Sequence, residues 1–426
     1  MVDKIRGREL ALIALINFEK KKKIPSKLGG FKIIEKGNKP NREIQKAYDY
    51  FFGTVKMIRR IDYILEKHLK NKRLEELPLP IRNILREGVY GLLFSGDPEY
   101  AVVNEMVNLA KKFGHNGTVA LVNAVLRNIH PVEYPKERIE YLSIYYSFPE
   151  FLVRMLLKDY GDEITEKILK ESNKPPITTI RVNRIKVTPE EVVQELKKKG
   201  FKVQEIENRK YNLISESKVI YSESFKKGHF QIQGVTQNIN IELLSPQRGE
   251  IILDLCAAPG TKSTGIAELM EDEGIVLAVD KKNLHLISQN AKRLGIKSVY
   301  PVKADVLNFS VKEVDRILLD VPCSGTGIMN KKGDIRWNLT EESLERLIKL
   351  QREMLWKASE NLKPGGILVY STCSVLKREN EEQIEWFLRE KSGFTIDYAK
   401  NNDIFIKNLP EEPFYDGGFG AIIRRR

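Results

Sequence analysis

Short apolar runs alternate with amphipathic segments from residue 251 onward. The runs read IILDL, IVLAVD, SVYPVKAD, RILLDVP and GILVYST, and the segments between them, such as KKNLHLISQNAKRLG, repeat apolar residues at helical spacing. Strands that are apolar on both faces are covered by helices on both sides, which is typical of a parallel sheet. We therefore expect residues 246–426 to form a doubly wound, Rossmann-like α/β sheet that binds its ligands at the carboxyl ends of its strands.

The preceding part of the chain has a different pattern. Apolar residues recur every three to four positions in residues 5–18, 44–69 and 81–94, which predicts an all-helical domain over residues 1–140. Residues 141–245 combine a helical segment, SFPEFLVRMLLKDYG, with a strand-like run, ITTIRVNRIKV, and predict a small α+β connector. The chain of 426 residues is thus expected to have a multidomain α and α/β fold in three parts.

The net charge of +13 is concentrated near the N-terminus. Residues 1–140 hold 27 Lys and Arg against 17 Asp and Glu. A basic domain suits a phosphate-rich partner, because each Lys or Arg that contacts a phosphate releases condensed counterions. A solvated basic surface explains the same charge, so charge by itself does not decide whether the domain binds nucleic acid.

Composition and spacing exclude several classes of protein. No apolar run approaches the roughly 20 residues that cross a bilayer, and the start, MVDKIRGREL, lacks an export signal, so we expect a cytoplasmic protein that does not bind membranes. The three cysteines form no CxxC pair and the five histidines lie outside the cysteine motifs. We therefore predict no metal site, which argues against a zinc-dependent deaminase. Nothing in the sequence implies a protein partner, and we expect a monomer.

The stretch DLCAAPGTKS, residues 254–263, predicts a tight turn between the first strand of the sheet and its helix. Asp280 ends the second strand and lies 20 residues after Gly260, which is the spacing at which a carboxylate binds ribose hydroxyls. Asp305 follows the third strand, where it is placed to meet an adenine amino group. We therefore expect a cofactor that contains a nucleoside.

The composition of this turn selects among such cofactors. A nicotinamide dinucleotide needs the pattern G-x-G-x-x-G so that the backbone can close on a pyrophosphate, whereas here Ala257, Ala258 and Pro259 leave only Gly260. S-adenosyl-L-methionine has a ribose, a sulfonium and an amino acid end but no phosphate. We predict that it is the cofactor, with Cys256 as a small buried thiol beside it.

Two cysteines, Cys323 and Cys373, follow buried strand-like runs in LLDVPCSGTG and VYSTCSV. A methyltransferase that acts on an exocyclic amine uses carbonyl and carboxamide oxygens after the fourth strand, where this chain has a Pro-Cys pair. A thiol suits another reaction, because C5 of cytosine becomes nucleophilic only when a thiolate adds to C6. Asp320 is a candidate to hydrogen-bond the N3 and amino edge of the ring, and a second thiol would act when the adduct is broken. This chemistry leaves open which cysteine attacks.

Longer motifs resemble known families. The segments RNILREGVYGLLFSGDPEYAVVNEMVNLAKKF and VNAVLRNI, within about residues 5–130, resemble the NusB family, whose helical bundle binds RNA. The motifs DLCAAPGTK, DVPCSGTG, GDIRW and YSTCSV, the last followed by RENEEQIEWFL, resemble the Sun/Fmu superfamily of RNA cytosine-5 methyltransferases. Together they resemble bacterial enzymes that methylate 16S ribosomal RNA, over nearly the whole chain.

The resemblance implies roles for individual residues. Cys373 would be the nucleophile and Cys323 would assist product release, with 16S ribosomal RNA as the partner. The positions that contact S-adenosyl-L-methionine in the family correspond here to Cys256, Ala257, Ala258, Pro259, Gly260, Thr261, Lys262, Asp280, Asp305 and Asp320. The chain departs from the family at Gly260-Thr261-Lys262, where GGK is common, and at residues 233–238, which lack the acidic and seryl members of QDxxSQ.

Two alternatives remain open. A transfer RNA cytosine-5 methyltransferase carries the same catalytic motifs, and only the NusB-like segment speaks against it. A non-catalytic RNA-binding factor would need neither thiol. Within GDIRW, Arg336 and Trp337 are candidates for lining an RNA groove, although Trp337 equally suits a hydrophobic staple before a helix.

Overall fold

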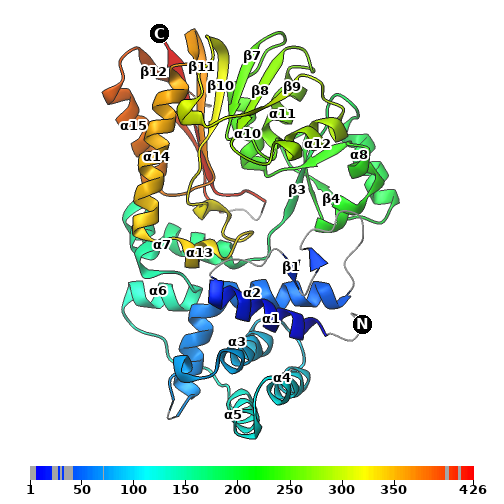
Figure 1. Cartoon of the computed structure of the whole chain (residues 1–426), viewed down its shortest axis with the longest axis vertical. Coiled ribbons are helices and arrows are strands. Elements are labelled where there is room, and N and C mark those ends of the chain that lie inside the picture. The colour runs from blue at the N-terminus through cyan, green and yellow to red at the C-terminus, as the bar shows by residue number, and fades with distance from the viewer. Residues whose placement is uncertain are drawn as a thin grey trace. The chain divides into compact units, whose positions relative to one another are not determined.

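The structure is a computed structural model that describes residues 6–21, 27–28, 31–32, 42–70, 72–398, 403–410 and 414–426 (Figure 1). The chain divides into two compact units. The first, which we call the helical unit, comprises Met1–Asn173 together with Lys332–Asn338. The second, the sheet unit, comprises Lys174–Lys331 and Leu339–Arg426. The borders expected at residues 140 and 245 stay predictions.

The helical unit confirms the helices expected from periodicity. Its helices are α1 (Gly7–Lys21), α2 (Arg42–His68), α3 (Leu79–Leu93), α4 (Glu99–Phe113), α5 (Asn116–Arg127), α6 (Arg138–Tyr146), α7 (Glu150–Asn173) and α13 (Ile335–Asn338), with a 3-10 turn, η1 (Leu74–Glu76). Pro78 precedes α3 and Pro80 lies in its first turn, where a missing backbone N–H costs nothing. A small hairpin of β1 (Lys27–Leu28) and β2 (Phe31–Lys32) was not expected.

One apolar core holds most of these helices together. Ile61 of α2, Ile84 of α3, Met106 of α4 and Val122 of α5 are all buried in the same cluster. They come from helices whose apolar residues recur at three- and four-residue spacing, so each helix presents one stripe to the core.

The sheet unit begins with the α+β connector that the sequence predicts. Its elements are β3 (Thr178–Val182), α8 (Pro189–Lys198), β4 (Val203–Glu205), β5 (Asn212–Ser215), η2 (Ser217–Tyr221), α9 (Glu223–Lys226), β6 (Phe230–Ile232) and α10 (Val235–Leu244). The strands form an antiparallel sheet in the order β4-β5-β3-β6. Thr188 caps α8 through its hydroxyl, with Pro189 in the first turn, so the sequence itself marks where this helix begins.

The rest of the sheet unit alternates strands and helices. The elements are β7 (Ile251–Leu255), α11 (Thr261–Leu269), β8 (Ile275–Asp280), α12 (Leu284–Leu294), β9 (Val299–Lys303), η3 (Val306–Asn308), β10 (Val314–Asp320), η4 (Thr326–Ile328), α14 (Glu341–Ser359), β11 (Leu362–Thr372), η5 (Lys377–Glu379), α15 (Glu381–Glu390), β12 (Phe394–Asp397), β13 (Phe405–Asn408) and β14 (Gly418–Arg425). The strand order is β12-β14-β11-β10-β7-β8-β9, with β13 also paired to β14.

Strands β9, β8, β7, β10 and β11 are parallel and lie side by side in Figure 1. Strands β12, β13 and β14 are antiparallel to their neighbours. The chain winds outward in one direction from β7 to β9 and in the other from β10 to β11, so the strand order reverses between β7 and β10. Ligands of such sheets bind at this reversal, outside the carboxyl ends of the strands.

Helices cover both faces of the parallel strands. Neighbouring residues of a strand point to opposite faces. Accordingly, Ile252 is buried in one cluster with Ile266 of α11 and Ile287 of α12, whereas Leu253 is buried in another with Leu355 of α14. The predicted doubly wound sheet is confirmed. Among the described residues, no helix has the length and apolar composition to cross a membrane.

Candidate active site

The turn after β7 is built from residues that allow a sharp change of direction. Gly260 has a φ of 89°, and a side chain there would lie 2.9 Å from the backbone of Ile287 on α12. Only glycine fits this conformation and this approach without strain. The backbone N–H of Gly260 donates to the carbonyl of Ala257 at 2.6 Å, and α11 begins at Thr261. The turn therefore returns the chain to the carboxyl edge of the sheet, as predicted.

Asp280 and Asp305 lie at the ends of the next two strands. Asp280 ends β8 and accepts the backbone N–H groups of Ala258 at 3.0 Å and Lys282 at 2.9 Å. Asp305 caps η3 by accepting from Leu307 and pairs with Lys281 at 2.9 Å. The hydrogen bond from Lys281 lowers the pKa of Asp305. Asp280 thus ties the turn after β7 to the end of β8.

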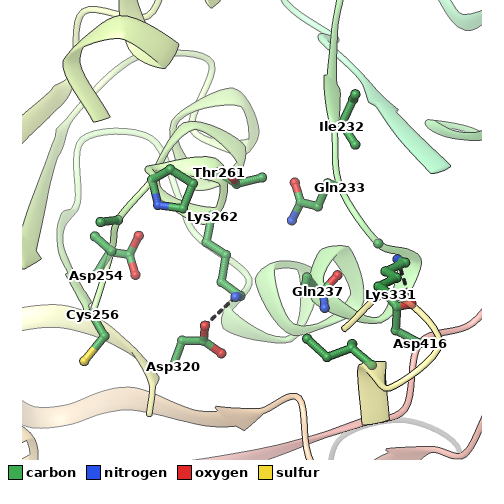
Figure 2. A pocket seen from close by; sticks show the side chains of 15 residues that line it. Ile232, Gln233, Gln237, Asp254, Cys256, Thr261, Lys262, Asp320, Lys331 and Asp416 are labelled. Carbon is green, nitrogen blue, oxygen red and sulfur yellow. Dashed lines mark hydrogen bonds and ion pairs between the residues drawn. The ribbon is translucent and has the colours of Figure 1, made fainter. Parts of the chain in front are cut away.

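A cavity of about 340 Å³ opens at the carboxyl ends of β7 and β10 (Figure 2). It is lined by Ile232, Gln233, Gly234, Gln237, Asp254, Cys256, Ala257, Ala258, Pro259, Thr261, Lys262, Asp320, Ile328, Lys331 and Asp416. Most of the predicted turn, with Asp320, lies on its wall, whereas Gly260, Asp280 and Asp305 are not among the lining residues. The cavity occupies the point where the strand order reverses.

An ion pair crosses this cavity. Lys262 reaches from α11 to Asp320 at the end of β10, with 2.5 Å between Nζ and Oδ2 (Figure 2). Burial lowers the pKa of Lys262, but the adjacent Asp320 carboxylate outweighs it, so that the pKa is raised. The other oxygen of Asp320 accepts the hydroxyl of Ser371 at 2.7 Å. Lys262 is therefore a cation that orients Asp320.

The two cysteines singled out in the sequence lie together. Strands β10 and β11 pair in parallel with Asp320 opposite Ser371, so the loops that follow them start side by side. The sulfur atoms of Cys323 and Cys373 are 3.2 Å apart, and both residues are partly exposed. Cys323 and Cys373 are not among the lining residues of the cavity, although Asp320, three residues before Cys323, is.

The surroundings of the thiols differ. The hydrogen bond with Cys373, burial, and the charges of Glu379 and Asp320 raise the pKa of Cys323 well above its usual value. Burial and the carboxylates of Asp320 and Asp280 raise the pKa of Cys256. In Figure 2 the sulfur of Cys256 points away from the Lys262–Asp320 ion pair. Cys323 and Cys256 therefore keep their protons at neutral pH.

The connector contributes the opposite wall of the cavity. Gln233 and Gln237 line it, and Lys331 pairs with Asp416 there at 2.7 Å (Figure 2). Gln237 and Asp416 occupy the space that a side chain at Gly234 would need. A side chain at position 234 would therefore displace both of these neighbours.

Arg336 and Trp337 of the GDIRW motif lie away from this cavity. Arg336 is fully buried in the helical unit, with its guanidinium 3.8 Å from the ring of Phe148 and 2.8 Å from Oδ1 of Asn173. The indole N–H of Trp337 donates to the carbonyl of Val55 at 2.6 Å. The interpretation of Arg336 as an RNA-groove residue is wrong, because a buried guanidinium with protein acceptors cannot contact RNA. Trp337 packs against the core of α1 and α2.

Sequence reasoning assigned no role to two buried charged residues, Glu379 and Arg181. Glu379 lies next to both cysteine loops, and Arg181 joins β3 to Glu268 of α11 at 2.8 Å. A charged residue inside an apolar pattern, as in TTIRV, is the one signal that could have indicated Arg181. Among the described residues, no group of three or more His, Cys, Asp or Glu side chains is arranged to hold a metal ion.

Comparisons with known proteins agree with this architecture. Residues 6–131 match the NusB family, residues 148–219 match the RsmF/B-like ferredoxin-like domain, and residues 241–416 match the family described as 16S rRNA methyltransferase RsmB/F. The chain is 32% identical to the probable ribosomal RNA small subunit methyltransferase B of Bacillus subtilis, over 96% of this chain and 94% of that protein. The chain belongs to the RsmB family. Members of this family are ribosomal RNA methyltransferases.

Another RsmB relative and two solved structures also match this chain. The Synechocystis protein named probable ribosomal RNA small subunit methyltransferase B is 32% identical over 88% of this chain and 89% of its own. The crystal structure titled PH0851 superposes with a TM-score of 0.80 at 27% identity over 99% of both chains. A methyltransferase homologue from Pyrococcus horikoshii gives a TM-score of 0.60 at 28% identity, over 68% of this chain and 100% of its own.

Proposed function

We propose that this RsmB-family enzyme transfers a methyl group from S-adenosyl-L-methionine to C5 of a cytosine in 16S ribosomal RNA, by way of a covalent bond from Cys373 to C6. The observation that carries the proposal is the pair of thiols 3.2 Å apart, beside Asp320 at the carboxyl ends of β10 and β11. An enzyme that methylates a nitrogen of its substrate needs no covalent bond to the base, because the nitrogen itself attacks the methyl group. Such an enzyme has no use for two adjacent thiols.

The residues at the turn suit the cofactor. The turn carries Ala257, Ala258 and Pro259 at positions where a dinucleotide-binding turn has glycines. It therefore lacks the close backbone approach that binds a pyrophosphate. Each carboxylate oxygen of Asp280 accepts one backbone N–H and has a second acceptor site for a ribose hydroxyl. Residues 256–262, Asp280 and Asp305 would hold S-adenosyl-L-methionine, which supplies an electrophilic methyl group when bound.

The remaining residues support the chemistry on the base. Cys373 as a thiolate adds to C6 of the cytosine, and the electron density moves to C5 and N3. Asp320, oriented by Lys262, accepts from the amino edge of the ring. After C5 takes the methyl group, a water molecule accepts the proton from C5 and the electron pair of that C–H bond forms the C5–C6 double bond. The bond from C6 to sulfur breaks at the same time, and its electron pair returns to Cys373 as a thiolate.

The two thiols differ in a way that suits this division of labour. Because the pKa of Cys323 is raised by its hydrogen bond, by burial and by nearby carboxylates, Cys323 keeps its proton and can donate an S–H hydrogen bond to a Cys373 thiolate. The resemblance to the Sun/Fmu superfamily favours the same order, with Cys373 as nucleophile and Cys323 assisting release.

The test is methyl transfer to unmodified 16S ribosomal RNA, with transfer RNA as the comparison substrate and the product base mapped. We expect 5-methylcytosine in the ribosomal RNA only. Cys373→Ala should lower the rate by about 10⁴-fold or more, as the loss of a covalent nucleophile does in other enzymes.

Cys323→Ala should instead accumulate an RNA adduct that survives a denaturing gel. The double variant Cys323→Ala/Cys373→Ala is the matched control, and it should show no adduct. Methylation of a nitrogen, or an adduct that persists in the double variant, would overturn the mechanism.

A further inference from the structure

Each catalytic thiol is followed by a serine. The chain reads Cys323-Ser324 after β10 and Cys373-Ser374 after β11. Both serines are buried, although hydroxyl side chains are usually exposed, so each needs a buried partner. The two loops that carry the thiols therefore each send one hydroxyl into the interior of the sheet unit.

Both hydroxyls reach the same carboxylate, that of Glu379 on η5, which is fully buried. Oε2 of Glu379 accepts the hydroxyl of Ser374 at 2.5 Å and also the hydroxyl of Ser324. Oε1 accepts the backbone N–H of Ser324 at 2.8 Å and the side-chain amide of Gln351 at 2.9 Å. One side chain thus joins the residues that follow Cys323 and Cys373.

The surrounding contacts fix this carboxylate in place. Gln351, fully buried on α14, also donates to the carbonyl of Pro322 at 2.9 Å, immediately before Cys323. The hydroxyl of Tyr370 on β11 donates to the backbone carbonyl of Glu379 at 2.8 Å. The loop of Cys323 is therefore held on both sides, and Glu379 is itself anchored to the strand that leads to Cys373.

The four hydrogen bonds leave Glu379 no further role as a ligand. A carboxylate has about four acceptor positions, two on each oxygen, and the protein fills all four. Substrate cannot reach a fully buried and fully bonded group. A buried carboxylate also costs free energy compared with an apolar side chain. Its placement is therefore explained by what it orients.

We propose that Glu379 is a positioning residue that sets the distance between Cys323 and Cys373 by holding the serine after each of them. The inference rests on the proposed function for its catalytic meaning, because the thiols have a shared task only if both act on one adduct. The distance itself can be measured without RNA or cofactor.

The first test measures how fast the two thiols form a disulfide. Diamide oxidises two neighbouring thiols to a disulfide and is itself reduced to the hydrazide, and mass spectrometry after alkylation reports which cysteines have joined. We expect rapid bonding of Cys323 to Cys373 in the wild type. Glu379→Gln should slow it roughly tenfold, the effect of losing about 1.4 kcal/mol of orientation. The control Glu385→Gln, at an exposed position of α15, should leave it unchanged.

The second test separates positioning from a general loss of structure. Ser374→Ala removes one bond to Glu379 and should slow disulfide formation less than Glu379→Gln does. The alkylation rate of Cys256, measured in every variant, reports whether the sheet unit stays folded. Equal disulfide rates in Glu379→Gln and wild type would overturn the inference. So would a slower disulfide accompanied by faster alkylation of Cys256, because that shows unfolding.

Methyl transfer then connects the two proposals. We expect Glu379→Gln to lower kcat, leave the KM for S-adenosyl-L-methionine unchanged and accumulate the RNA adduct, because release needs Cys323 in place. If Glu379→Gln slows the disulfide while Cys373→Ala methylates normally, the proposed function fails and the positioning role stands. If Cys373→Ala is inactive while Glu379→Gln leaves the disulfide rate unchanged, the proposed function stands and the positioning role fails.

Discussion

At the scale of single residues, Asp254 shows how the fold perturbs a carboxyl group beside the cavity. Asp254 lies fully buried in β7, accepts the hydroxyl of Ser263 at 2.5 Å through Oδ2, and has no partner for Oδ1. Burial raises the pKa of Asp254 to about 7, and the charges of Asp320 and Asp280 act in the same direction. Below pH 7 the folded protein therefore holds a proton that the unfolded chain releases near pH 4.

This difference predicts the sign of a pH effect on stability. Between pH 5 and pH 8 the folded state binds more protons at Asp254 than the unfolded state, so the free energy of unfolding falls as the pH rises, by about 2 to 3 kcal/mol. Asp254→Asn removes this contribution but keeps an acceptor for Ser263. Urea unfolding of both proteins at pH 5 and pH 8 measures the effect. The free energy of unfolding of the variant, relative to that of the wild type, should be higher at pH 8 than at pH 5. An equal difference at both pH values would contradict the assignment.

The candidate site was predicted from sequence in part, and the residues explain why. The turn around Gly260 and the strand-end residues Asp280, Asp305 and Asp320 follow from the order of strands and from turn chemistry, both of which are local patterns. Glu379 could not be predicted in the same way. Its role depends on two loops about 50 residues apart that meet only because β10 and β11 are neighbours in the sheet.

At the scale of elements, Arg181 joins the connector to the Rossmann-like sheet. Its guanidinium lies between β3 and α11, bonded to Glu268 at 2.8 Å and to the carbonyl of Thr261 at 2.9 Å. A side chain at Gly265 would lie 2.6 Å from this guanidinium, so α11 needs a glycine there. The buried ion pair fixes the start of α11, and with it Lys262, relative to the connector.

Breaking this ion pair on one side should be costly. Arg181→Met leaves the carboxylate of Glu268 buried without its cation, which typically costs about 3 to 5 kcal/mol. The double variant Arg181→Met/Glu268→Met should recover most of that loss, because no charge is left unpaired. A double-mutant cycle by urea unfolding measures the coupling. Additive effects of the two substitutions would show that the pair is not coupled.

Elements with a strong local pattern were predicted more completely than elements without one. The strands β7, β8, β10 and β11 coincide with the apolar runs of the sequence. The hairpin of β1 and β2 has strands of two residues each, too short to produce a period.

At the scale of the whole molecule, the chain passes from one unit to the other more than once. The segment Lys332–Asn338 lies between β10 and α14 in sequence but belongs to the helical unit. No sequence pattern predicts this, since the side chains of GDIRW suit either the lining of an RNA groove or, for Trp337, a hydrophobic staple before a helix. Its place depends on acceptors far away in sequence, at Lys56, Ser147 and Ser172.

Arg336 should therefore stabilise helices rather than bind RNA. Arg336→Leu leaves the carbonyl groups of Lys56, Ser147 and Ser172 without their donor, at a cost of about 2 to 4 kcal/mol. Hydrogen exchange should become faster in α2, α6 and α7 but not in β7 or β10. Arg389→Leu, at an exposed position of α15, is the control and should change neither. Weaker RNA affinity with unchanged exchange would contradict this prediction.

The return of seven residues to the helical unit has a consequence for how such a protein can be taken apart. If the gene were cut after codon 173, the C-terminal product would still carry Arg336 and Trp337. The residues that these two side chains contact, such as Asn173 and Val55, would be on the N-terminal product. We therefore expect neither half to fold as a self-sufficient module, and we expect an exchange of the N-terminal part between distant homologues to succeed only when this heptapeptide is exchanged with it.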